Sequence, residues 1–168
     1  MKDYDGDFYL KDAAAMMLMS ILYPARLARF DLLKPVGFLA KCITRWDAKC
    51  DARLHQLMCY INSTLADRMV GYVGDAPEHL TARIYADADF AGCPYTLKST
   101  SGVHAAIQGK NTRFPWAASS KGQSATAQST PEAELASLNE AMREKGEPAL
   151  SIWQAVLGRF HYPADPSW

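Results

Sequence analysis

Net charge is what this sequence lacks most clearly. Its 168 residues carry 18 Lys and Arg against 18 Asp and Glu, so the formal net charge is zero. A strongly basic balance would indicate a nucleic-acid partner, and the overall charge therefore predicts none. One local excess exists, because residues 24–70 hold eight basic and four acidic residues. This modest patch is interpreted as a solvated helical face.

Paired cysteines and long apolar runs are also missing. Cys42, Cys50, Cys59 and Cys93 form no C-x-x-C pair, so their spacing predicts no zinc site. No secretory signal is evident, and the cysteines are interpreted as reduced thiols of an intracellular protein. The apolar run at residues 13–23 is too short to cross a bilayer. It is expected to be a buried helix, and no membrane partner is expected.

What is present is the composition of a globular protein, 49% hydrophobic and 21% charged. Residues 11–23 are expected to form a helix that ends at Pro24, and residues 31–43 a second helix. Residues 47–65 are the clearest helix, with Asp47 as its N-cap. The expected buried stripe of this third helix consists of Leu54, Leu57, Met58, Ile61 and Leu65.

A stretch with several glycines and a proline, residues 67–80, is expected to separate two domains, residues 1–75 and 76–168. Three short segments beyond it predict strands, and their short connections favour an antiparallel meander. The predicted class is therefore α+β, a helical segment followed by a three-stranded sheet with further helices. The strands are expected at residues 80–87, 102–108 and 112–120.

A helix is expected over residues 129–145, with Ser129 or Thr130 as its N-cap. Gly146 and Pro148 are expected to break it. A further short helix is expected at residues 150–160.

The first predicted strand ends in two acids. Asp87 and Asp89 alternate with Ala86 and Ala88, so both carboxylates lie on one face. Acids are rare inside strands, which makes this pair a candidate site. The plainer interpretation is a strand that runs out into a turn, where Asp is common.

The helix after Pro131 carries a third acid of interest. At about 100° per residue, Leu135, Leu138 and Met142 define its expected buried stripe. Glu134 lies near that stripe, and a carboxylate on the buried side is costly unless it is paired or bound to a metal ion. The alternative is a glutamate at the rim of the stripe that reaches water.

Four ordered blocks resemble the ribonuclease H domain of copia-type LTR retrotransposon polyproteins. The family reads roughly S-D-A-D-W-A-G, S-T-S-G-Y, W-S-S-K-K-Q and S-T-E-A-E-Y. Four blocks in order at similar spacing are more specific than any one of them. In this chain they are I-Y-A-D-A-D-F-A-G (84–92), S-T-S-G-V-H-A-A-I (99–107), F-P-W-A-A-S-S-K (114–121) and S-T-P-E-A-E-L (129–135).

The first half resembles the helical tail of the reverse transcriptase in the same polyproteins. Residues 20–32, S-I-L-Y-P-A-R-L-A-R-F-D-L, match the pattern S-L-L-Y-L-A-x-x-T-R-P-D-I without a gap. Residues 54–64 are similar to the helix K-R-I-L-R-Y-L-K-G-T that follows. The chain departs from the family at Phe30, usually proline, and at Cys50 and Asp51, where the family has His-Trp.

The resemblance implies a function and a site. It implies a partial ribonuclease H-like fold that cleaves the RNA strand of RNA–DNA hybrids, with the rest of the polyprotein as a partner. Matched position by position, the catalytic and metal-binding acids are Asp87 and Glu134, with Asp89 adjacent and possible as a further ligand. The implied cofactor is Mg²⁺ or Mn²⁺, because two such ions can activate water and neutralise the leaving oxygen.

The family has a further metal-binding acid on a later strand, for which this sequence offers no match. Asp165 lies at about the right distance, but P-A-D-P is not expected to form a central strand. The isolated chain is therefore expected to have little or no ribonuclease H activity. The alternative is a non-catalytic remnant, degraded or co-opted as a nucleic-acid-binding or structural module.

Other polar and aromatic residues are given ordinary roles. His104 is expected to be a packed or surface histidine, and Tyr85 and Trp116 to pack rather than stack on bases. Ser119, Ser120 and Lys121 resemble a Ser/Lys pair, but nothing else in the sequence indicates acyl transfer.

Overall fold

The computed structural model describes residues 10–93 and 95–159. The chain divides into two compact units, Met1–Gly71 with Ser119–Lys121 and Tyr72–Ala118 with Gly122–Trp168. Helices and a three-stranded antiparallel sheet are both present, so the predicted α+β class is confirmed. Every helix of the described residues is too short or too polar to span a bilayer.

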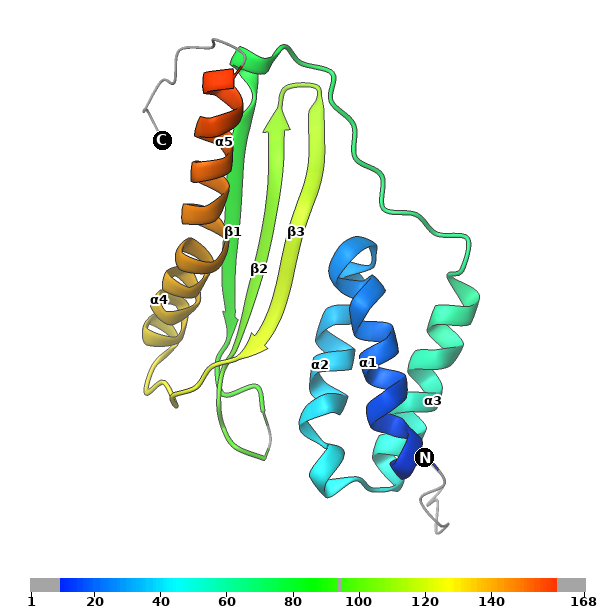
Figure 1. The fold of residues 1–168 in the computed structure, drawn as a ribbon. Coiled ribbons are helices and arrows are strands. Elements are labelled where there is room, and N and C mark those ends of the chain that lie inside the picture. The colour runs from blue at the N-terminus through cyan, green and yellow to red at the C-terminus, as the bar shows by residue number, and fades with distance from the viewer. Residues whose placement is uncertain (1–9, 94, 160–168) are drawn as a thin grey trace. The chain divides into compact units, whose positions relative to one another are not determined.

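Three helices make up the first unit: α1 (Lys11–Ala28), α2 (Leu33–Lys41) and α3 (Ala48–Ser63) (Figure 1). Short 3-10 turns precede α2 and α3 at Phe30–Leu32 and Ile43–Arg45. The helices bury their apolar faces against one another, which is what stabilises short helices in water. The core includes Leu18, Ala25, Val36, Leu39, Cys42, Cys50, Leu54 and Leu57.

The predicted end of the first helix at Pro24 is wrong. Helix α1 continues to Ala28 with Pro24 inside it. Proline removes one hydrogen bond of the helix, but the turn that follows contains Ala25, which is fully buried. Packing of that turn keeps the chain helical past the proline.

Helix α3 begins where its N-cap was predicted. The Asp47 side chain accepts a hydrogen bond of 2.8 Å from the backbone N–H of Cys50. Within the predicted stripe, Leu54 and Leu57 are buried, whereas Met58 and Leu65 are exposed, at 37% and 62%. The stripe was therefore placed partly on the wrong side of the helix.

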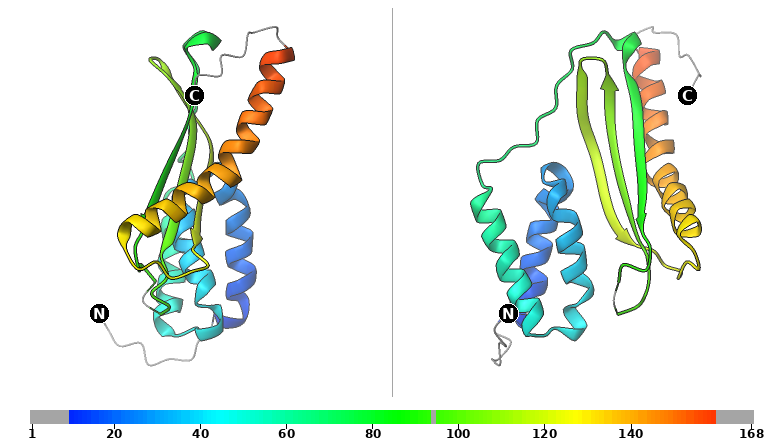
Figure 2. Two further views of the ribbon diagram at one scale, coloured as in Figure 1. Left: turned by 90° about the vertical axis from the view of Figure 1, so that its left-hand side faces the viewer. Right: turned by 180° about the vertical axis from the view of Figure 1, so that it is seen from behind.

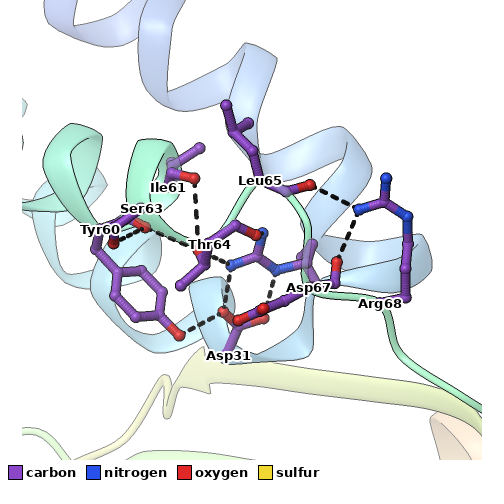
Figure 3. A network of polar contacts seen from close by, with 9 residues as sticks. Asp31, Tyr60, Ile61, Ser63, Thr64, Leu65, Asp67 and Arg68 are labelled. Carbon is purple, nitrogen blue, oxygen red and sulfur yellow. Dashed lines mark hydrogen bonds and ion pairs between the residues drawn. The ribbon is translucent and has the colours of Figure 1, made fainter.

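Arg29 ties the end of α1 to the end of α3 within this unit. Its guanidinium pairs with both carboxylate oxygens of Asp31, at 3.1 and 2.8 Å. It also donates to the carbonyl and the hydroxyl of Thr64, at 3.2 and 2.8 Å. Tyr60 donates to Asp31 from the last turn of α3 (Figure 3). Beside them, Arg68 donates to the carbonyl oxygens of Leu65 and Asp67.

Strands β1 (Thr81–Asp89), β2 (Thr100–Gly109) and β3 (Thr112–Gly122) form the sheet in the order β1-β2-β3 (Figure 1). All three predicted strands are thus present. Strands β1 and β2 are antiparallel, with Tyr85 opposite His104 and Asp87 opposite Gly102.

Asp75 fastens the short connection between β2 and β3. Its carboxylate accepts hydrogen bonds from the backbone N–H and the side-chain amide of Asn111, at 2.7 and 3.1 Å. The backbone N–H groups of Gly74 and Asp75 both donate to the buried hydroxyl of Thr112. The segment before β1 is therefore held to the turn between β2 and β3, at the end of the sheet where β1 begins.

Helix α4 (Thr130–Ala141) begins at the predicted N-cap, because the Ser129 hydroxyl accepts a hydrogen bond from the Glu132 N–H. The predicted break at Gly146 and Pro148 is wrong. The chain remains helical through a π-helical segment, Met142–Gly146, into α5 (Glu147–Arg159). Pro148 has no N–H to donate, and a wider turn ahead of it accommodates this loss. Figure 2 shows the change of direction between α4 and α5.

Candidate functional site

The two acids of β1 lie on its exposed face. Exposure alternates along the strand, with the odd-numbered residues exposed and the even-numbered residues half-buried. Asp87 and Asp89 therefore share the exposed face, as predicted from the alternation. The half-buried face consists of Ala82, Ile84, Ala86 and Ala88.

Asp89 takes part in the turn that follows β1. Its carboxylate lies so close to Gly92 that a Cβ at that position would collide with it. The Gly92 N–H donates to the backbone carbonyl of Asp89 at 3.3 Å. Ala91, the residue before Gly92, has a positive φ of 51°. This geometry agrees with the plainer interpretation of the second acid, a strand running out into a turn.

Helix α4 contacts the sheet through small side chains, so the predicted stripe of large residues is wrong. Ala133, Ser137 and Ala141, spaced four residues apart, are fully buried. Leu135, Leu138 and Met142 are exposed, at 66%, 49% and 48%. Small residues let the helix axis approach the strands closely, and larger side chains at those three positions would hold it away.

Glu134 is exposed beside this small-residue face, rather than directed toward the core. Helix α4 reaches the first acid through its backbone instead. Ser137 Oγ donates a hydrogen bond of 2.6 Å to the carbonyl oxygen of Asp87. Since α4 packs against β1, whose covered side is the even-numbered one, the Asp87 carboxylate lies on the other side of the strand.

These placements do not by themselves form a metal centre. Within residues 10–93 and 95–159, no group of three or more His, Cys, Asp or Glu side chains could hold an ion. Mg²⁺ is held firmly only where several oxygens converge. Asp87 and Glu134 are two exposed carboxylates, and that they bind a metal ion stays a prediction. Asp165 lies outside the described residues.

Hydrogen bonds join the first, second and fourth sequence blocks around the end of β1. The Ser99 hydroxyl accepts from the N–H of Ala91, at 3.2 Å. The Gln123 side chain donates to Ser101 Oγ at 3.1 Å and to the carbonyl oxygen of Ala133 at 2.8 Å. Ser99 and Ser101 are 0% and 1% exposed, so these bonds satisfy buried polar groups.

Gln123 was not singled out from the sequence, although it connects β2, the segment after β3 and α4. Its backbone N–H also donates to the carbonyl oxygen of Ser99 at 2.9 Å. The signal that could have found it is the final letter of W-S-S-K-K-Q, which Gln123 matches in the chain's own W-A-A-S-S-K-G-Q.

The remaining residues of interest have structural surroundings. His104 is exposed on β2, and its ring lies 6.2 Å from that of Tyr85. Tyr85 donates to the side chain of Gln108 at 2.9 Å. Trp116 lines an apolar cavity of about 160 Å³ with Ile84 and Trp153. Ser119, Ser120 and Lys121 lie on β3.

No family model, curated protein or solved structure matches the chain.

Proposed function

We propose that this chain is part of a copia-type retrotransposon polyprotein. Its first three helices correspond to the tail of the reverse transcriptase, and its sheet with α4 and α5 to the first part of a ribonuclease H-like domain. The complete domain would hydrolyse the RNA strand of RNA–DNA hybrids with Mg²⁺ or Mn²⁺. It would distinguish RNA from DNA through the 2′-hydroxyl and the shape of the hybrid.

The single observation that supports this proposal most is the set of hydrogen bonds that connects the first, second and fourth blocks. Ser137 reaches the backbone of the first block, Ser99 holds its turn, and Gln123 connects the second block to the fourth. Ser137 lies two residues after the fourth block, and its bond to the first block spans 50 positions of the chain. The three blocks therefore belong to one connected part of the fold, as the matching parts of a single domain would.

The helical half offers a similar argument. The two stretches that resemble the reverse-transcriptase tail, residues 20–32 and 54–64, are tied together by Arg29. Its hydrogen bonds to Asp31 lie within the first stretch, and those to Thr64 reach the second. The Arg and Asp of the family's R-P-D are both present, and Phe30 replaces only the residue between them.

Little or no activity is proposed for these 168 residues alone. Two carboxylates that are exposed, with that of Asp87 on the side of β1 away from α4, would hold metal ions poorly. Phosphoryl chemistry depends on position, and a misplacement of about 1 Å can lower the rate about 100-fold. Asp87 and Glu134 would acquire their catalytic role only with further oxygen ligands beside them.

A labelled RNA–DNA hybrid incubated with the purified protein and Mg²⁺ or Mn²⁺ tests this. We expect no cleavage above the level of the Asp87→Asn variant. Glu132→Gln is the matched control, since Glu132 is an exposed acid of α4 that caps the Gln128 N–H instead. Robust cleavage that is lost in Asp87→Asn and Glu134→Gln, but kept in Glu132→Gln, would contradict the proposed inactivity and support the assignment of the two acids.

A non-catalytic remnant is the second candidate, and the exposure of both acids favours it. A co-opted module would retain hybrid binding without depending on the carboxylates. Binding measured with RNA–DNA hybrid and with duplex DNA separates the two ideas. Preference for the hybrid that is unchanged in Asp87→Asn would support a binding module. Equal, weak binding to both nucleic acids would leave neither duplex as a specific partner.

A further inference from the structure

The outer surface of α3 carries a histidine and a cysteine that the proposed function does not use. His55 and Cys59 are both exposed. They are four residues apart on the helix, so their side chains lie on the same side, one turn from each other. The sulfur of Cys59 lies 3.8 Å from Nδ1 and 3.9 Å from Nε2 of His55.

This separation is close to what one metal ion requires. A thiolate sulfur and an imidazole nitrogen bound tetrahedrally to Zn²⁺, at about 2.3 and 2.05 Å, lie about 3.6 Å from each other. Both side chains are exposed and can adjust their torsions, and the terminal torsion of a histidine is broad. A turn of the imidazole directs one nitrogen toward an ion that Cys59 also binds.

The backbone beneath the pair is well fixed. Helix α3 is capped by Asp47 and packs through the buried side chains of Leu54 and Leu57, on another side of the helix from the pair. The spacing of the two ligands is therefore set before an ion arrives, which reduces the ordering that binding would require.

We propose that His55 and Cys59 bind a single Zn²⁺ ion, with water at the remaining positions. A thiolate with an imidazole favours Zn²⁺ and similar soft or borderline metals over Mg²⁺ and Ca²⁺. Only two protein ligands are assigned, since no cluster of three or more occurs in the part of the chain that the structure describes. The spacing H-x-x-x-C lies outside the cysteine-pair patterns, which is why the sequence predicted no zinc site.

Titration of the full, reduced chain with Co²⁺ or Cd²⁺ tests the proposal, because sulfur bound to either ion gives a charge-transfer absorption band. One equivalent of ion should saturate the band, and Zn²⁺ should displace it. Cys59→Ser should abolish the band, and His55→Ala should weaken binding by about tenfold or more. The matched control is His104→Ala, an exposed histidine on β2, which should bind the ion as the parent protein does.

A rescue variant separates chelation from simple thiol binding. Cys59→His replaces the sulfur by a second imidazole at the same spacing, so Zn²⁺ binding should return without the charge-transfer band. The variants alter exposed positions only, and circular dichroism should show the parent helix content. A band that persists in Cys59→Ser, affinity unchanged in His55→Ala, or no band in the folded parent protein would each overturn the site.

Discussion

Ser137 of α4 donates its hydroxyl hydrogen to the backbone carbonyl of Asp87, 50 positions earlier in the chain, at 2.6 Å. Ser137 is fully buried between Ala133 and Ala141 on the face that contacts the sheet. The hydroxyl therefore fixes the position of α4 along β1, next to the residue that the resemblance makes catalytic.

Ser137→Ala should lower the free energy of unfolding by about 1 kcal/mol, because the Asp87 carbonyl loses its partner. Urea denaturation measures the change. Ser151→Ala is the control, since Ser151 is exposed and its hydroxyl donates to the Glu147 carbonyl oxygen within its own helix. A loss below about 0.5 kcal/mol is expected there. Equal effects at the two positions would contradict a positioning role for Ser137.

Two neighbouring residues of α3 should respond very differently to truncation. Leu57 is 5% exposed and Met58 is 37% exposed. Leu57→Ala should cost about 2–4 kcal/mol, because it removes buried methyl groups and leaves a cavity. Met58→Ala should cost less than about 1 kcal/mol. Chemical denaturation of the two variants checks the orientation of the helix, and similar losses would show that the buried face is misplaced.

The Arg29–Asp31 pair should make the free energy of unfolding depend on pH in the acidic range. The hydrogen bond from Arg29 is the largest cause that lowers the pKa of the Asp31 carboxyl, and Tyr60 adds to it. The folded pKa lies below the unfolded value of about 3.9, so the carboxylate's contribution is present above that pH and is lost as the pH falls through the folded pKa.

Asp31→Asn should therefore destabilise the protein at neutral pH and matter progressively less in acid. Urea denaturation from pH 7 down to about 3 measures the difference between variant and parent. A difference for Asp31→Asn that stays constant with pH would contradict the lowered pKa.

Two glycines of β2 form a further matched pair. A Cβ at Gly109 would collide with the Asp75 carboxylate and approach the His79 carbonyl oxygen to 3.1 Å. A Cβ at Gly102 would meet only the Asp87 carbonyl oxygen, at 3.9 Å. Gly109→Ala should thus be destabilising by about 1–3 kcal/mol, and Gly102→Ala close to neutral. Thermal unfolding of both variants measures the two losses. A larger loss for Gly102→Ala than for Gly109→Ala would contradict the prediction.

Local signals predicted the elements of the fold well. The Asp47 and Ser129 caps depend on side chains that reach only three residues ahead, so the sequence contains all the information they need. The strands followed from alternation and from the turn at residues 110–111. The acids Asp87 and Asp89 were correctly placed on one face for the same reason.

Relationships between elements were harder to predict. The stripe on α4 was chosen by hydrophobicity, but close approach to the sheet favours Ala133, Ser137 and Ala141 because they are small. The helix also continues past Gly146, since a π turn replaces the break that glycine and proline predicted. Gln123 joins three elements at once, and no local pattern reports such a contact.

The three buried cysteines allow the opening of each unit to be followed by the rate at which its thiols react. Cys42 and Cys50 lie in the helical unit and Cys93 in the sheet unit, each at most 6% exposed, whereas Cys59 is open to solvent. Burial also raises the pKa of the Cys50 thiol to about 11, and the thiolate is the reactive form. An alkylating reagent would therefore modify Cys59 first. The later modification of Cys93, compared with that of Cys42 and Cys50, would time the opening of the two units separately in one sample.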